Sequence, residues 1–575
     1  MSLYFDYMYK MSVSDLQGYL GGDIYDLLVE WYPTGDSPIT KDRLVKMINS
    51  IYGTSIFDNR NFRRDMLLTL DKDSIYEIRD NCLKGSESKE DDPYKIVEIV
   101  SKKPWNKNKI SAYLLNLWGL PENVFDKQSL QVELCQDITA GERFYELLDY
   151  QYYIKQRTLN ILNSGNMLER MLIHMPTGTG KTKTSMHIIT NYIEFTLEKR
   201  GLILWVAHTT ELLQQAYDTF VEVWSNLGDG TIRTYKIWGN ANIELGSDEI
   251  NGIAFCGLSK LMSMKTSSPE MFEVLHKNCR LLVFDEAHKA AAKQTRDTIE
   301  ALLRMPQGYD NRALLGLSAT PGRTTQLSSD NTLLSDMFGN KLIYIDSSIL
   351  NQVNYGRLGA LNKVAETNII KYFQERRILA KMDIERLSYE YEFSDSELSV
   401  LRSELVDLGF DDKDYSKEQL NVLARNKSRN KAIMVKLRSL YKDGVPTIVF
   451  ACSVSHAKML SAMLTLEEIP NSLVTGDMNM VDRKNAIESF KNRNSDVNII
   501  INYEVLTTGF DSKNIRCVFI TRPTKSVVLY SQMLGRGLRG PMMGGNERCT
   551  LVDIDDNLEA FDNETAFSHF DDYWK

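Results

Sequence analysis

The sequence predicts an α/β protein in which two parallel-sheet domains follow one another, with a helical accessory domain before them and a helical segment between them. The first observation is a series of continuous apolar runs of strand length, which suit strands that a parallel sheet buries on both faces. The second is a charged, helical stretch at 355–440, which separates these runs into two groups. The runs lie at 171–175, 202–207, 252–256, 280–284 and 313–317, and then at 446–451, 472–474, 497–501 and 517–520.

The other elements are short helices broken by turns. Helical spacing of apolar residues predicts helices at Lys41–Tyr52, Ile110–Leu117 and Asn368–Leu379. The polar stretch Gly85–Asp92 predicts an exposed loop, and its Glu87-Ser-Lys89 triplet lacks the flanking apolar strand of a nuclease site. We therefore expect a helical accessory domain at 1–134, an α/β domain at 135–344, a helical connecting segment at 345–434, a second α/β domain at 435–556 and an acidic tail at 557–575.

Composition indicates a folded protein of the cytoplasm. The 575 residues are 43% hydrophobic and 25% charged, which is ordinary for globular chains. No run approaches the ~18 apolar residues that span a bilayer, and the N-terminus lacks the basic and apolar regions of a signal peptide. The seven cysteines form no Cys-x-x-Cys pair, which argues against zinc or a disulfide framework and for buried free thiols.

The net charge of −9 is largely local, because residues 550–575 hold eight acidic residues and one basic residue. A protein that grips a nucleic-acid backbone through amides and hydroxyls needs no overall positive charge. The acidic balance therefore does not exclude a nucleic-acid partner.

A phosphate-binding loop is predicted at Pro-Thr-Gly-Thr-Gly-Lys-Thr, residues 176–182, between an expected strand and a helix that begins near Lys183. Backbone amides of such a loop and the helix N-terminus surround phosphates. Lys181 would neutralise phosphate charge and Thr182 would bind Mg²⁺. A glycine-rich turn by chance is the alternative, which the coincidence of strand, Gly-Lys-Thr and helix disfavours. The expected nucleotide contacts here are Thr177, Gly178, Thr179, Gly180, Lys181 and Thr182.

An acid pair is predicted to complete the metal site. Asp285-Glu-Ala-His288 follows an apolar strand, at the end of the strand where α/β sheets bind ligands. Asp285 would hold Mg²⁺ and Glu286 would polarise the attacking water. We expect His288 to couple this site to neighbouring segments rather than to bind metal.

Two arginines far along the chain are candidates for the same site. Gln532, Arg536 and Arg539 are spaced by four and three residues, which predicts one face of a helix. An arginine that crosses a domain cleft can stabilise the charge that develops as the γ-phosphoryl group leaves. A solvated surface or a salt bridge is the alternative. One ATP site is therefore expected to form from two distant parts of the chain.

These strings together resemble the superfamily 2 helicases and translocases, over roughly residues 145–555. The resemblance implies two RecA-like domains. Within the superfamily the chain is similar to restriction-enzyme motor subunits of the ResIII type and to XPB- and RadD-like DEAH-box DNA helicases. Departures from the pattern are Met175, normally a small residue, and Gly257-Leu-Ser259, where threonine often stands first. The matching strings are 176–182, 285–288, 318–320, 508–511 and 532–539, supported by 147–151, 207–212 and 317–322.

The resemblance also implies roles for single residues, with ATP and Mg²⁺ as cofactors. Gln151 would read the adenine edge, while Ser318 and Thr320 would link the ATP state to strand binding. The resemblance places further nucleotide contacts at Gly509, Asp511 and Gln532. It places contacts to the nucleic-acid backbone at His208, Thr209, Ser259, Ser453, Thr475, Gly476, Thr507 and Thr508.

The leading hypothesis is an ATP-dependent translocase or helicase, with DNA favoured over RNA, in DNA processing or in restriction and phage defence. A second is a motor that displaces proteins without separating strands. A third is a nucleic-acid sensor whose residues 1–134 recruit a partner. Only about 20 residues follow the second expected sheet, so any cleavage is expected from a separate nuclease subunit.

Overall fold

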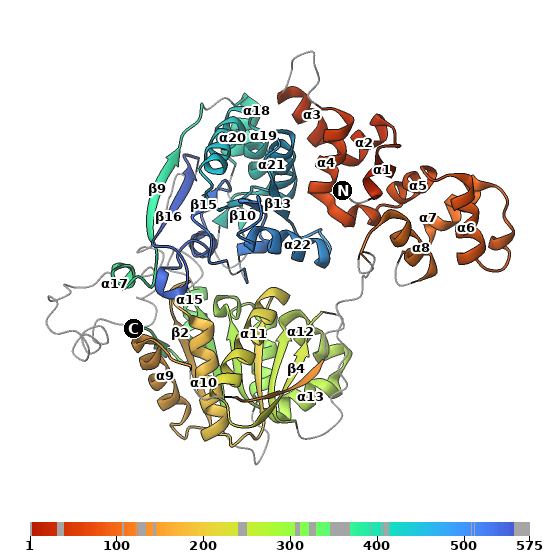
Figure 1. The fold of residues 1–575 in the computed structure, drawn as a ribbon. Coiled ribbons are helices and arrows are strands. Elements are labelled where there is room, and N and C mark those ends of the chain that lie inside the picture. Colours follow the sequence, from red (N-terminus) through yellow and green to blue (C-terminus); the bar gives the residue numbers. More distant parts are fainter. Residues whose placement is uncertain are drawn as a thin grey trace.

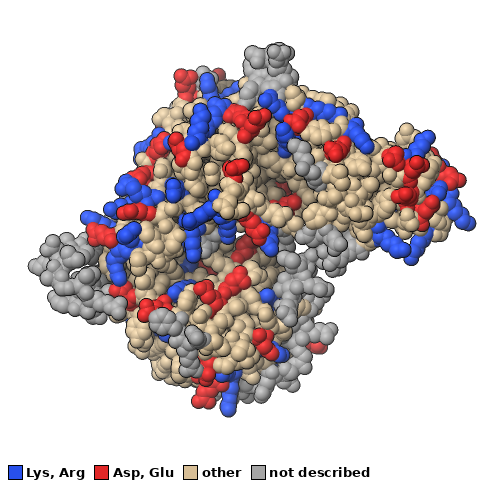
Figure 2. Space-filling view, viewed as in Figure 1, with Lys and Arg blue, Asp and Glu red and all other residues tan. Residues whose placement is uncertain are grey.

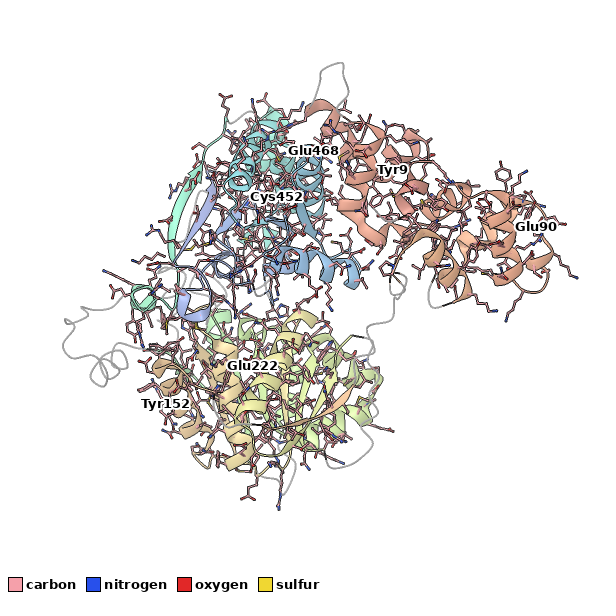
Figure 3. All side chains as sticks on the ribbon, in the orientation of Figure 1. Tyr9, Glu90, Tyr152, Glu222, Cys452 and Glu468 are labelled. Carbon is pink, nitrogen blue, oxygen red and sulfur yellow. The ribbon has the colours of Figure 1, made fainter. Side chains whose placement is uncertain are left out.

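The structure, a computed structural model, shows two α/β lobes and a helical N-terminal region (Figure 1). Among its described residues, no helix combines the length and the apolar character needed to cross a membrane. All seven cysteines are free and five are buried, as expected, and Cys452 lies inside the second lobe (Figure 3). The structure describes residues 3–31, 39–105, 108–121, 124, 134–141, 145–239, 250–304, 311–320, 329–345, 369–390, 393–403, 406–407, 413–507, 509–510 and 512–556.

The N-terminal region is helical, as the sequence predicts. The expected helices at 41–52 and 110–117 are confirmed as α4 and α8, and the expected loop at 85–92 contains only a short 3-10 turn at Glu87–Lys89. Thr40 caps α4, because its side chain accepts a hydrogen bond from the backbone N–H of Arg43. The helices are α1 (Tyr4–Met8), α2 (Val13–Leu20), α3 (Gly22–Trp31), α4 (Lys41–Tyr52), η1 (Gly53–Asp58, 3-10), α5 (Arg60–Leu68), α6 (Lys72–Cys82), α7 (Pro93–Lys102) and α8 (Lys109–Trp118).

The first lobe is an eight-stranded sheet in the order β1-β4-β5-β3-β6-β7-β2-β8, parallel except where β1 pairs with β4. All five expected strands are confirmed, and β1, β4 and β8 were not anticipated. Strand β4 alternates between exposed and buried residues over its first half, so it lacks the continuous apolar run that reveals the others. The strands are β1 (Cys135–Thr139), β2 (Leu168–His174), β3 (Leu202–Ala207), β4 (Thr231–Ile237), β5 (Gly252–Gly257), β6 (Cys279–Asp285), β7 (Arg312–Ser318) and β8 (Leu342–Ile343).

Helices cover both faces of this sheet, which is why its central strands are apolar throughout. Successive residues of β3 belong to opposite cores, with Ile203 and Trp205 in one and Leu204 and Val206 in the other. The helices are α9 (Asp149–Leu162), α10 (Lys181–Phe195), α11 (Thr210–Leu227), α12 (Leu258–Ser267), α13 (Pro269–Asn278), α14 (Lys293–Leu303) and α15 (Ser329–Met337).

The second lobe is a six-stranded parallel sheet in the order β13-β14-β12-β15-β16-β9. Its four expected strands are confirmed as β12 to β15. The strands are β9 (Lys381–Leu387), β12 (Thr447–Phe450), β13 (Asn471–Val474), β14 (Ile499–Asn502), β15 (Cys517–Ile520) and β16 (Arg548–Ile554), with helices α20 (Lys427–Lys442), α21 (Val454–Leu466), α22 (Met480–Lys491) and α23 (Val527–Leu534).

The connecting segment expected at 345–434 is helical only in part. It holds α17 (Ile369–Glu375), α18 (Asp395–Leu401) and α19 (Lys417–Arg425), but also β9, which pairs with β16 at the edge of the second sheet. A two-stranded ladder of Val406–Asp407 and Lys413–Asp414 lies there as well. Strand β9 escaped the sequence pattern because an edge strand is exposed on both faces and can be charged.

Candidate active site

The phosphate-binding loop joins the end of β2 to the start of α10, which begins at Lys181 rather than near Lys183. Gly178 and Gly180 adopt φ values of +88° and +83°, a left-handed conformation that favours glycine. Lys181 and Thr182 thus occupy the first turn of a helix, where free backbone N–H groups attract anions. Met175, the departure from the family pattern, is fully buried in the first-lobe core.

The acid pair faces this loop from the end of β6. The Lys181 Nζ atom lies 3.8 Å from Asp285 Oδ1 and 3.6 Å from Glu286 Oε1. Glu286 has φ +54°, an uncommon value for a residue with a side chain, of the kind found at functional sites. Lys181 and an acid pair that follows it by about 105 residues therefore meet in one place, with Asp285 buried and the other two side chains partly exposed.

The surroundings shift the pKa values of the two acids in opposite directions. Burial raises the pKa of Asp285 above its ordinary value. Burial also acts to raise the pKa of Glu286, but the positive charge of Lys181, followed by those of His288, His208 and Arg536, outweighs burial and lowers that pKa. Glu286 is therefore held as a carboxylate, the form that accepts a hydrogen bond from water.

The donor set suits Mg²⁺ bound together with a nucleotide. Mg²⁺ is usually held by one or two protein oxygens and by substrate phosphates rather than by a protein cage. The Asp285 carboxylate lies beside the loop that carries Thr182, and the described residues contain no group of three or more His, Cys, Asp or Glu side chains that could hold a metal ion by themselves. His288 is buried with Nδ1 3.4 Å from Glu286 Oε2, so it contacts the acid pair.

Neighbouring segments brace the loop. The backbone N–H of Met175 donates to the Ser318 carbonyl at 3.2 Å, which ties the loop to the end of β7. The Ser318 hydroxyl accepts a hydrogen bond from the Thr320 backbone N–H at 3.1 Å. Ser318 therefore connects the phosphate-binding loop to Thr320. That these two residues link the ATP state to strand binding stays a prediction.

Gln151 is hydrogen-bonded to the phosphate-binding loop. Its Nε2 donates to the Thr179 carbonyl at 3.0 Å, and its Oε1 accepts from the Leu148 backbone N–H at 3.0 Å. The Tyr150 hydroxyl donates to the same Thr179 carbonyl at 2.6 Å. The side chain of Gln151 is buried and both ends of its amide are engaged, so recognition of adenine by this residue stays a prediction.

The prediction that Gln532, Arg536 and Arg539 share one helical face is wrong. Helix α23 ends at Leu534, and Arg536 lies in a 3-10 turn in which its N–H donates to Met533. Arg539 lies further on, in a β-bridge with Leu379. Gly535, which caps α23, packs against the other lobe: a Cβ there would lie 2.4 Å from Thr177 Cγ2 of the phosphate-binding loop.

The second lobe nevertheless reaches the phosphate-binding loop. Arg536 donates to the Thr507 carbonyl at 2.7 Å and to the Phe510 carbonyl, and its charge contributes to the lowered pKa of Glu286. A Cβ on Gly178 would lie 3.7 Å from the backbone nitrogen of Arg539. The structure thus brings the lysine and acid pair of the first lobe and the arginines of the second to one junction.

The residues expected to contact nucleic acid lie where strands end and helices begin. The hydroxyls of Thr209 and Ser453 cap α11 and α21, which places equivalent helix N-termini in both lobes. Ser259 lies in the first turn of α12 and His208 precedes the cap of α11. Acidic and basic side chains are interspersed on the face seen in Figure 2, which fits contacts through amides and hydroxyls.

The remaining expected contacts differ in accessibility. Thr475 is fully buried and its hydroxyl donates to Asp477 Oδ1 at 2.6 Å, whereas the adjacent Gly476 is exposed. The Thr507 hydroxyl donates to the Glu504 carbonyl, and Gln532 is half-buried on α23. Thr508 and Asp511 lie outside the described residues.

An ion pair between the lobes was missed by the sequence interpretation. Arg483 Nη1 on α22 lies 2.8 Å from Glu211 Oε1 on α11. A Cβ on Gly509, which has φ +68°, would lie 2.9 Å from the Cβ of the same glutamate. The glutamate lies within the helicase-like string 207–212, but nothing in the sequence identifies its partner.

Comparisons with known proteins agree with this geometry. Residues 144–323 match the family model described as type III restriction enzyme, res subunit, and residues 429–540 match the helicase conserved C-terminal domain. The chain is 25% identical to the putative ATP-dependent helicase IRC3 of Saccharomyces cerevisiae, over 73% of this chain and 53% of IRC3. It is 24% identical to the type I restriction enzyme EcoAI endonuclease subunit of Escherichia coli, over 72% and 47%.

A third relative is the ATP-dependent DNA helicase uvsW of Enterobacteria phage T4, with 23% identity over 68% of this chain and 66% of that protein. The chain spans about half the length of IRC3 and of the EcoAI subunit. The two family models fall on the two lobes whose junction holds the phosphate-binding loop, the acid pair and the arginines. The chain therefore belongs to the superfamily 2 helicases, with a ResIII domain followed by a helicase C-terminal domain.

Proposed function

We propose that this protein is a nucleic-acid-stimulated ATPase that translocates along or unwinds nucleic acid, and that DNA is its substrate. The observation that carries the proposal is the composite junction, in which the loop that carries Lys181 meets the segment that carries Arg536 and Arg539: Gly535 packs against Thr177, and Arg539 lies beside Gly178. A site divided in this way makes hydrolysis depend on how the lobes meet, which is how a chemical step becomes motion.

Each residue has a distinct part in the reaction. Lys181 and the loop amides bind the phosphates, and the Glu286 carboxylate orients the attacking water. Mg²⁺, held by Thr182 and Asp285, supplies charge that balances the phosphate oxygens when it is bound. Arg536 and Arg539 stabilise the negative charge that develops in the transition state.

Stimulation by nucleic acid follows from where the strand contacts lie. Thr209 belongs to the first lobe and Ser453 and Gly476 to the second, so a strand that touches all three holds the lobes together. Closer lobes bring Arg536 toward the phosphates, and hydrolysis accelerates. The alternative is a sensor in which ATP binding alone changes the conformation. Such a sensor does not need Glu286, Arg536 and Arg539, which serve hydrolysis, so their presence favours a motor.

The choice of DNA and of pathway rests on the relatives. The T4 protein is named a DNA helicase and the EcoAI protein is named a restriction endonuclease subunit. We propose by analogy a role in DNA processing or in restriction and phage defence, with any cleavage supplied by a nuclease partner. A motor that moves along duplex DNA without separating strands is the alternative within this proposal.

ATP turnover measured with single-stranded DNA, duplex DNA, RNA and no nucleic acid tests the proposal. We expect the highest rate with DNA, and Glu286→Gln should bind ATP and strand yet fail to turn over. Strand-displacement and translocation assays then separate a helicase from a non-unwinding motor. A rate that none of the three nucleic acids changes would show that the protein is not a motor.

A further inference from the structure

The N-terminal helical region is built onto the second lobe, although the first lobe follows it in sequence (Figure 1). Helix α4 packs against α21, and residues of both belong to one continuous hydrophobic core. Met47, Ile48 and Ile51 of α4 are completely buried in it. The Ser50 and Ser461 hydroxyls lie 3.2 Å apart across this contact.

Asp482 of α22 fixes the orientation of the two parts. Its carboxylate accepts hydrogen bonds from the Thr54 hydroxyl at 2.9 Å and from the Ser55 backbone N–H at 2.8 Å. Gly53 makes this approach possible, because it has φ +50° and a Cβ there would lie 2.8 Å from the Asp482 carboxyl carbon. The junction between the N-terminal region and the second lobe is thus a buried and specific contact.

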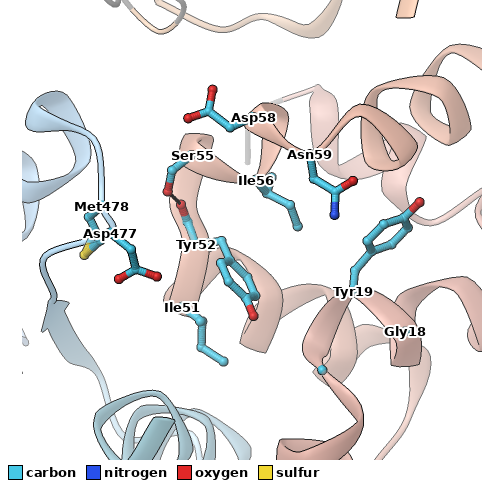
Figure 4. Close-up of a pocket in the computed structure, with 11 residues that line it drawn as sticks. Gly18, Tyr19, Ile51, Tyr52, Ser55, Ile56, Asp58, Asn59, Asp477 and Met478 are labelled. Carbon is cyan, nitrogen blue, oxygen red and sulfur yellow. Dashed lines mark hydrogen bonds between the residues drawn. The ribbon is translucent and has the colours of Figure 1, made fainter. Parts of the chain in front are cut away.

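A cavity of about 360 Å³ lies at this junction. That volume is within the range of roughly 300–1,000 Å³ typical of small-ligand sites. The rings of Tyr19 and Tyr52 border it from the N-terminal region, and Asp477 and Met478 border it from the second lobe (Figure 4). The N-terminal region supplies most of the lining, and the second lobe closes one side.

The chemistry of the lining suits a planar group that donates hydrogen bonds. Tyrosine rings and a methionine thioether offer apolar faces, while Asp58 and Asp477 offer carboxylate acceptors. No described lining residue is Lys or Arg, so phosphate is disfavoured. Lys458 lies outside the lining, where its Nζ pairs with Asp477 at 2.6 Å and lies 4.7 Å from the Tyr52 ring centroid.

The location indicates the ligand. Asp477 and Met478 directly follow Thr475 and the exposed Gly476, where the proposed function puts the strand backbone. Aromatic side chains beside such a backbone track commonly stack on unpaired bases. We propose that this cavity takes one unpaired base of the bound strand, with preference for bases that carry an exocyclic amino group. The inference rests on the proposed function, because it requires a strand at 475–476.

Gly18, on α2, offers a way to fill the cavity without disturbing the fold. It lines the cavity, and a Cβ added there meets no atom within 4 Å. Gly18→Trp should therefore block the base, whereas Gly18→Ala leaves the space open and removes a helix-weakening glycine. Gly22→Trp is the matched control, since Gly22 also meets no atom within 4 Å but does not line the cavity.

The measurement is the affinity of each protein for three 12-mers: oligodeoxycytidine, oligothymidine and an abasic chain. We expect the wild type to bind oligodeoxycytidine about fivefold more tightly than oligothymidine, the value of one hydrogen bond. Gly18→Trp should weaken binding of oligodeoxycytidine by roughly 5- to 150-fold, as expected for one lost stacked base. It should also remove the preference for cytosine, while binding of the abasic chain stays unchanged.

The outcomes separate the two proposals. If neither the wild type nor any variant binds a 12-mer, the proposed function fails. If the 12-mers bind but Gly18→Trp behaves like Gly22→Trp, the base site is wrong and the proposed function stands. A different result would overturn the base site in favour of a site for a basic protein segment. In that case all three 12-mers bind equally well, and an arginine-rich peptide binds every protein except Gly18→Trp.

Discussion

The two lobes share a parallel-sheet architecture but contribute to the active site in different ways. In the first lobe, the Lys181 Nζ atom lies within 4 Å of the carboxylates of both Asp285 and Glu286. In the second, Arg536 is placed by two backbone carbonyls in a turn that follows a helix. This difference fits the proposed function, in which the first lobe binds the reactants and the second supplies transition-state charge.

The lobes differ also in what they carry. The second lobe shares one core with the N-terminal region, and it contacts the first lobe through Leu538 and Met543, which pack in the first-lobe core, and through the Glu211–Arg483 pair. Because α4 and α21 pack within the shared core, we expect the N-terminal region and the second lobe to move as one body against the first. Four experiments test this division of labour, and the one with the strongest expected effect comes first.

Lys181→Ala should reduce ATP turnover to the level of a protein-free control. The phosphates lose their main positive partner, and the two acids face each other without it. Nucleotide binding and turnover are measured together, with Lys183→Ala as the control, because Lys183 Nζ on the same helix donates to the Glu146 carbonyl instead. Appreciable turnover in Lys181→Ala would contradict the role of the first lobe.

Arg536→Ala should slow turnover by roughly 10³–10⁵, the value of such an arginine in other NTPases, while ATP affinity changes little. Strand binding without nucleotide should survive. Arg548→Ala, which removes an exposed arginine paired with Asp383 in the same lobe, is the matched control. Normal turnover of Arg536→Ala with nucleic acid present would mean that the second lobe supplies no such charge.

Glu211→Gln should raise the strand concentration for half-maximal ATPase by roughly two- to fivefold, the value of a partly exposed ion pair. The pair joins the lobes, and its side chains are 29% and 19% exposed for Glu211 and Arg483. Adding Arg483→Gln should cost less than the sum of the two single effects, because both changes break this ion pair, and what it adds reflects the bonds from Arg483 to the Thr475, Gly476 and Met478 carbonyls. Fully additive effects of the two substitutions would show that the pair does not couple the lobes.

Joining Ser50→Cys to Ser461→Cys by a disulfide should leave stimulated ATPase unchanged. The native hydroxyls lie 3.2 Å apart, so the cross-link demands little movement, and a single moving body is not hindered by it. The reduced form of the same protein is the control. Loss of stimulation on oxidation, restored on reduction, would show that the N-terminal region separates from the second lobe during turnover.

Most of the sheet framework could be predicted because buried parallel strands have a local signature. All nine expected strands form, whereas β1, β4, β8, β9 and β16 of the two main sheets were missed; β4 and the edge strand β9 have exposed, charged positions that hide them. The helix expected across Arg536 and Arg539 failed for a tertiary reason. Spacing alone permits a helix there, but the chain turns where Gly535 packs against Thr177 of the other lobe.

The sequence by itself determined the two α/β lobes, the phosphate-binding loop and the acid pair, because each depends on residues within a short window. The glycines of the loop adopt left-handed conformations, and the acids follow an apolar strand directly, so both features can be identified from neighbouring residues alone. Only the packing of distant segments brings Gly535 and Arg539 against the phosphate-binding loop, pairs Arg483 with Glu211, and joins the N-terminal region to the second lobe. Such contacts depend on which apolar faces and charges meet when distant segments pack, and no local pattern records that choice.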